Sequence, residues 1–81
     1  MSLSELLYGR LRDRYYLYGN VCTKFSYNNS VGLNFEGNAV TITYLDDYHK
    51  PVDPKHRYWK AGFLKTESLD EAFAFIEGAY S

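Results

Sequence analysis

Residues 58–80, YWKAGFLKTESLDEAFAFIEGAY, predict a strand, a short turn and an amphipathic helix in succession. Ser68 and Glu71 have the spacing of a capping box, in which a hydroxyl and a carboxylate each satisfy a backbone N–H at the start of a helix. The apolar residues that follow recur on one helical face and are Leu69, Ala72, Phe73, Ile76 and Tyr80. A face of this kind must cover apolar surface elsewhere in the chain.

The strand before this helix, residues 57–65, supplies that surface. Side chains alternate between the two faces of a strand. The alternation predicts that three side chains face the helix, namely Trp59, Ala61 and Phe63. It predicts that Tyr58, Lys60 and Leu64 point the other way.

The N-terminal part of the chain repeats the helix signal and then changes to a strand period. Ser2 and Glu5 form a second S-x-x-E, and the helix is predicted over residues 3–13. Its apolar residues are Leu3, Leu6, Leu7 and Leu11. From Tyr15 the period is two, which predicts one long strand with Leu17, Val21, Phe25 and Tyr27 on the inner face. Its outer face then carries Tyr16, Tyr18, Asn20, Cys22 and Lys24, and Gly19-Asn20 indicates a bend or bulge within it.

Two turns are expected to fix the register of the central strands. A two-residue turn at Gly37-Asn38 suits a hairpin. It makes every inner pair apolar: Phe35 with Val40, Leu33 with Ile42 and Val31 with Tyr44. For the hairpin before it, a three-residue loop at residues 28–30 is predicted, pairing Tyr27 with Val31 and Phe25 with Leu33.

These elements predict a single α+β domain over residues 1–81. The expected order is α-β-β-β-β-α, a four-stranded antiparallel meander with the N- and C-terminal helices packed on one face. Aromatic residues make up 19% of the 81 residues, which is enough to form a core and argues against disorder.

Charge and cysteine content narrow the function classes. The net charge of −1 argues against a general polyanion binder, which needs many Lys and Arg to displace counterions. The one cysteine, Cys22, cannot form an internal disulfide, and the chain shows no signal-peptide pattern or long apolar run. The expectation is a cytoplasmic protein with no membrane association.

The polar connection at residues 46–56, DDYHKPVDPKH, is long enough to be functional. Its metal-capable side chains are Asp46, Asp47, His49, Asp53 and His56. The two histidines have no spacing typical of a zinc site, and Asp47 with His49 has no nucleophile in a signature context to complete a catalytic group. No glycine pattern for a nucleotide phosphate occurs. We therefore predict no enzyme activity, no metal and no cofactor.

The remaining hypothesis is recognition of a protein by the aromatic outer sheet face and the 46–57 loop. Tyrosine supplies a large contact area at a small entropic cost, and exposed clustered aromatics mark interfaces. The predicted partner-binding residues are Tyr16, Tyr18, Tyr48, Arg57, Tyr58 and Lys60. By analogy of size and composition, the role is that of an inhibitor or accessory subunit of a larger complex, a class that includes phage-encoded anti-defence proteins. The sequence leaves monomer and homodimer both open.

The alternative is a nucleic-acid-binding domain. The segment Lys50, Lys55, His56, Arg57, Tyr58, Trp59 and Lys60 interleaves cations with aromatics, as surfaces for phosphates and stacked bases do. The sheet lacks the RNP1 run of the single-strand RNA-binding module.

Overall fold

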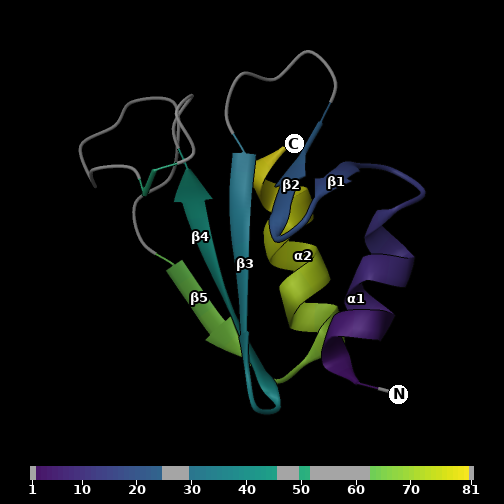
Figure 1. The fold of residues 1–81 in the computed structure, drawn as a ribbon, viewed down its shortest axis with the longest axis vertical. Helices are drawn as coiled ribbons and strands as arrows, with labels where there is room; N and C mark the ends of the chain where they lie inside the picture. Colours follow the sequence, from purple (N-terminus) through teal and green to yellow (C-terminus); the bar gives the residue numbers. More distant parts are fainter. Residues whose placement is uncertain (1, 25–29, 46–49, 52–62, 81) are drawn as a thin grey trace.

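The computed structural model describes residues 2–24, 30–45, 50–51 and 63–80, which form two helices and five strands (Figure 1). In chain order these are α1 (Leu3–Leu11), β1 (Tyr16–Tyr18), β2 (Val21–Thr23), β3 (Ser30–Glu36), β4 (Ala39–Leu45), β5 (Phe63–Thr66) and α2 (Leu69–Ala79). The α+β class with a helix before and after an antiparallel sheet is confirmed. The strand count is five instead of four.

The five strands form one antiparallel meander in the order β1-β2-β3-β4-β5. The predicted register of the central hairpin is confirmed, because Phe35 pairs with Val40 and Leu33 pairs with Ile42. Gly37 has a φ of +59°, a conformation that glycine adopts without steric cost and that a tight two-residue turn requires.

Both helices contribute to one core on the inner face of the sheet, and they lie next to each other along it (Figure 1). The fully or nearly buried apolar residues of this core are Leu7, Leu11, Cys22, Val31, Leu33, Val40, Ile42, Tyr44, Ala72, Ile76 and Tyr80. Leu6 departs from the predicted helical face, since 40% of it is exposed. The predicted face of the C-terminal helix is confirmed: Leu69 and Phe73, half-buried, pack against the same core.

The first correction concerns residues 16–23, which were predicted to lie in one long strand. Gly19-Asn20 is a hairpin turn, with Gly19 at a φ of +59° and Tyr18 opposite Val21. A two-residue turn places the flanking residues on the same face, so the alternation does not continue through it. Cys22 therefore faces inward and is fully buried, whereas Val21 joins the outer face.

The same hairpin changes the register of the next strand pair. Val31 lies opposite Cys22, and the Leu33 amide donates a 2.7 Å hydrogen bond to the Asn20 carbonyl. The predicted pairing of Val31 with Tyr27 and of Leu33 with Phe25 is therefore wrong. Phe25 and Tyr27 themselves lie outside the described residues.

The second correction concerns β5, where the predicted faces are exchanged. Leu64 pairs with buried Ile42 and packs against the core, while Phe63 pairs with Thr43 and is 67% exposed. Thr66 lies on the inner face as well, and its Oγ1 accepts a 3.0 Å hydrogen bond from the Ser68 amide. The inner face of β5 therefore combines the apolar Leu64 with the polar Thr66, a mixture that apolar alternation alone does not predict.

Both predicted helix caps are present. The Ser2 hydroxyl accepts from the Glu5 amide and the Ser68 hydroxyl accepts from the Glu71 amide. α1 ends at Leu11, two residues earlier than predicted, and the amides of Arg14 and Tyr15 both donate to the Leu11 carbonyl.

Basic residues cluster near the end of α1 and acidic residues in α2, and the two groups meet in the structure. Arg10 pairs with Asp70 at 2.9 Å and Arg14 pairs with Glu77 at 3.0 Å. Both guanidinium groups also lie over the Phe73 ring, at 5.3 and 6.0 Å from its centroid. Two of the three arginines in residues 10–14 therefore take part in the contact between the helices.

Candidate functional site

The outer face of the sheet carries a continuous row of side chains across all five strands. Residues directly opposite each other in an antiparallel sheet point to the same side. The pairings place five residues in one line: Tyr18, Val21, Gly32, Thr43 and Phe63. With neighbouring strands about 4.8 Å apart, the row is about 19 Å long.

This row has large aromatic ends and a floor of small residues. Tyr18 is 65% exposed and Phe63 is 67% exposed, while Gly32 and Thr43 between them rise little above the backbone. A shallow depression of about 220 Å³ occupies this floor. We call it the sheet groove, and its lining is Asn20, Val21, Gly32, Leu33, Asn34, Thr41, Thr43, Leu45 and Pro51.

Leu45 forms one side of the sheet groove and depends on the glycine beside it. A Cβ at Gly32 would lie 3.2 Å from Leu45 Cδ1, which is tighter than an ordinary contact. Because Gly32 has no side chain, Leu45 packs onto the sheet and is only 7% exposed although it lies on the outer face. Pro51 forms an isolated bridge with Leu45 and extends this side of the groove.

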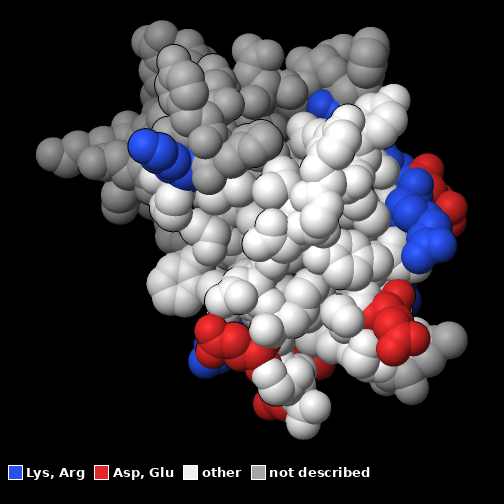
Figure 2. All heavy atoms as spheres, in the orientation of Figure 1, with Lys and Arg blue, Asp and Glu red and all other residues white. Residues whose placement is uncertain are grey.

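The residues that line the sheet groove carry no charge, but charged residues lie beside them on the outer face. Glu36 ends β3 and accepts a 3.1 Å hydrogen bond from Asn34, and Lys65 on β5 lies opposite Thr41. Figure 2 shows a broad area without Lys, Arg, Asp or Glu side chains in the middle of the view, with the charged side chains around it. The groove itself can therefore make apolar contacts and neutral hydrogen bonds, for example from Thr41 and Thr43.

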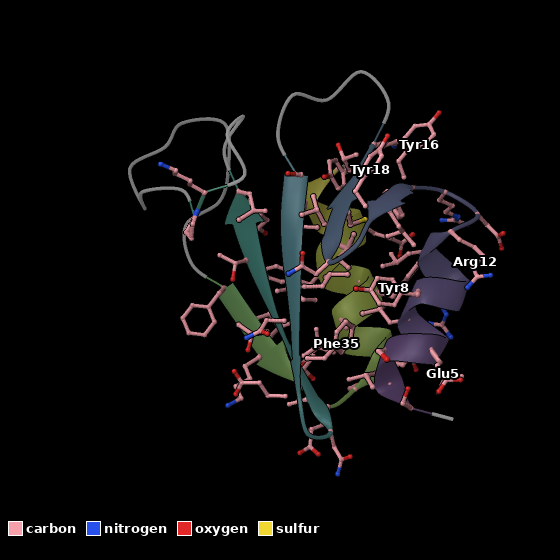
Figure 3. All side chains as sticks on the ribbon, in the orientation of Figure 1. Glu5, Tyr8, Arg12, Tyr16, Tyr18 and Phe35 are labelled. Atoms are coloured by element: carbon pink, nitrogen blue, oxygen red, sulfur yellow. The ribbon has the colours of Figure 1, made fainter. Side chains whose placement is uncertain are left out.

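Of the predicted partner-binding residues, Tyr16 and Tyr18 are described. Both project from β1 away from the protein, and Tyr16 is 53% exposed (Figure 3). Tyr8 and Phe35, in contrast, meet between α1 and β3 with their ring centroids 5.5 Å apart (Figure 3). Tyr48, Arg57, Tyr58 and Lys60 lie outside the described residues, as do His49 and His56.

Sequence reasoning missed Phe63 as a surface residue and missed the row that it completes. The signal that could have revealed the first part of this row is the Gly19-Asn20 dipeptide. It is identical to the Gly37-Asn38 dipeptide used to predict the central hairpin. A hairpin at both places would have put Tyr18 opposite Val21 and revealed the outer-face alignment on β1, β2 and β3. The position of Phe63 had no comparable signal.

The buried titratable groups of the core are held in their neutral forms. Burial raises the pKa of the Cys22 thiol from 9.0 to about 12, so the thiolate needed for nucleophilic chemistry is disfavoured at neutral pH. Burial also raises the pKa of the Tyr44 phenol. Residues 2–24, 30–45, 50–51 and 63–80 contain no group of three or more His, Cys, Asp or Glu side chains arranged to hold a metal ion.

Neither of the two described helices is long and apolar enough to cross a membrane.

Comparison of the chain with protein-family models, with curated proteins and with solved structures finds no match. The outer sheet face, with its exposed aromatic residues and its depression, is the surface from which a function can be inferred.

Proposed function

We propose that this protein is a non-enzymatic protein-binding module, an inhibitor or accessory subunit that docks on a larger protein through its outer sheet face. The observation that carries the proposal is the row in which exposed Tyr18 and Phe63 flank an uncharged floor of small residues. Binding energy at protein interfaces is concentrated in a few aromatic anchors beside well-packed depressions. The expected occupant is an apolar side chain or loop of the partner, seated in the sheet groove between the two rings.

The composition of this surface favours a protein partner over a nucleic acid. Nucleic-acid binding draws its affinity from Lys and Arg at phosphates, and the groove lining contains neither. The inner face is unavailable because both helices cover it. The alternative segment, residues 50–60, is described only at Lys50 and Pro51, so no structural observation favours it.

The proposal is tested by site-specific photo-crosslinking in the source cell. A photoreactive phenylalanine analogue replaces Phe63 in one sample and Leu6 in a matched control, because Leu6 is also an exposed apolar residue but lies on α1. We expect a discrete protein adduct from position 63 and none from position 6. Adding Tyr18→Ala should reduce the adduct at least about fivefold, since aromatic anchors contribute about 1–2 kcal/mol or more each.

Two outcomes would overturn the proposal. One is equal labelling from positions 63 and 6, which would show that contact at the groove is not selective. The other is an adduct at position 63 that nuclease treatment removes, which would establish the nucleic-acid alternative.

A further inference from the structure

A second concave surface lies beside the outer sheet face, at the junction of α1 and β1. It is a hollow of about 460 Å³, which is within the range of ligand-sized sites, about 300–1,000 Å³. We call it the basic hollow, and its lining residues are Arg12, Asp13, Arg14, Tyr15, Tyr16 and Lys24. Three basic residues and two tyrosines thus line the hollow together with a single acidic residue.

The arginines of the basic hollow differ in how they are engaged. Arg14 donates one N–H to Glu77. Its side chain is 64% exposed, so most of its five N–H donors are accessible to a ligand. The Arg12 guanidinium donates to no acceptor among the residues that the structure describes, and it projects from the end of α1 (Figure 3). Exposed arginine beside aromatic rings is suited to paired hydrogen bonds with a carboxylate.

The carbonyl of Leu11, the last residue of α1, is already hydrogen-bonded within the protein. A helix C-terminus normally presents free carbonyls with partial negative charge. The Leu11 carbonyl, however, accepts hydrogen bonds from the amides of both Arg14 and Tyr15, at 3.0 and 2.9 Å. The Leu11 carbonyl is therefore not free to repel an anion that binds in the basic hollow.

We infer that the basic hollow binds an acidic segment of the same protein partner that occupies the sheet groove. This inference rests on the proposed function and names the chemistry of the partner. Tyr16 lines the hollow and lies two residues from Tyr18 on the same side of β1, so the hollow adjoins the end of the row that Tyr18 forms on the outer face. A peptide carboxylate fits better than a nucleic-acid strand, because the positive charge is confined to three residues and the chain as a whole carries −1.

The test is a titration of ¹⁵N-labelled protein with two probes at low salt, followed by NMR. One probe is blocked hexaglutamate and the other is a hexathymidylate, which carries a similar charge on phosphates. We expect hexaglutamate to shift the amides of residues 12–16 and 24, and to bind more tightly than hexathymidylate. Arg12→Glu should weaken hexaglutamate binding at least fivefold, whereas Lys65→Glu, the same charge change on β5, should alter it less than twofold.

Equal weakening by Arg12→Glu and Lys65→Glu would overturn the inference, because it would show attraction by overall charge alone. Tighter binding of hexathymidylate at residues 12–16 would also overturn it, in favour of a nucleic-acid partner. The result is separable from the photo-crosslinking result. Hexaglutamate binding that depends on Arg12, together with no selective adduct at position 63, would sink the groove proposal and leave the hollow as an independent anion site.

Discussion

Alanine substitution at two adjacent positions in β5 distinguishes the two faces of the sheet. Phe63 is 67% exposed, so about a third of a side chain that buries 150–250 Å² elsewhere is covered. At about 25 cal/mol per Å² this is at most about 2 kcal/mol, and alanine and a compact unfolded state each retain part of it. We expect Phe63→Ala to cost about 1 kcal/mol. Leu64 packs against the core opposite Ile42, and Leu64→Ala should cost about 2–3 kcal/mol, the lower end for buried leucine because it is half-buried.

The measurement is urea unfolding of both variants and the wild type, followed by far-UV circular dichroism. Unchanged m-values would show that the variants unfold from the same compact state. A larger loss from Phe63→Ala than from Leu64→Ala would refute the reasoning, because it would mean that Phe63 faces the helices. In that case the outer row would lose one of its aromatic ends, and the groove proposal would fail with it.

Three further outcomes follow from particular contacts. The hydroxyl of buried Tyr80 donates to the Cys22 carbonyl at 3.0 Å, so Tyr80→Phe should lower the free energy of unfolding by about 1–2 kcal/mol, and no loss in urea unfolding would contradict that role. Ser30 is 2% exposed and its Oγ has no hydrogen-bond partner among the described residues, so Ser30→Ala should raise the melting temperature slightly; a lower melting temperature would show that the hydroxyl does have a partner. The Cys22 thiol has a pKa of about 12 when folded against an ordinary 9.0, so its contribution to stability is complete below pH 9 and is lost as pH rises toward 12. Between pH 9 and 12 the free energy of unfolding of the wild type should fall more steeply than that of Cys22→Ala, by up to about 1.4 kcal/mol per pH unit. Parallel pH profiles of the two proteins would show that the thiol does not cause the loss of stability.

The parts of the fold that the sequence predicted correctly are those set by local rules. Each helix begins at a serine whose hydroxyl caps a glutamate amide, and that signal is complete within four residues. The register of β3 and β4 follows from one turn flanked by long apolar alternation on both sides. In both cases the deciding residues are close together in the chain.

The errors arose at two places where the alternation of inner and outer side chains was assigned wrongly. One is the turn at Gly19-Asn20 and the other is β5. The strand between residues 15 and 27 was treated as continuous because the segments on each side of Gly19-Asn20 are only three residues long. Such short segments contain too few apolar residues to show that the inner face changes from odd to even positions. In β5 the alternation was started from Trp59, whereas in the structure Leu64 and Thr66 lie on the inner face and Thr66 accepts from the Ser68 amide.

The two errors together concealed the candidate site. Cys22 must turn inward for Val21 to join the outer face beside Tyr18, and Leu64 must turn inward for Phe63 to complete the other end of the row. Each change was missed because it depends on a turn length or a polar contact, and neither affects the hydrophobic content of the segment. The exposed Tyr16 and Tyr18 were predicted correctly, because the alternation that places them on the outer face precedes the Gly19-Asn20 turn. The sheet groove was not predicted, because small residues such as Gly32 and Thr43 form a depression only together with the residues on the neighbouring strands. A depression in a sheet is therefore a property of the register, and it becomes predictable only when every turn in the meander has been assigned.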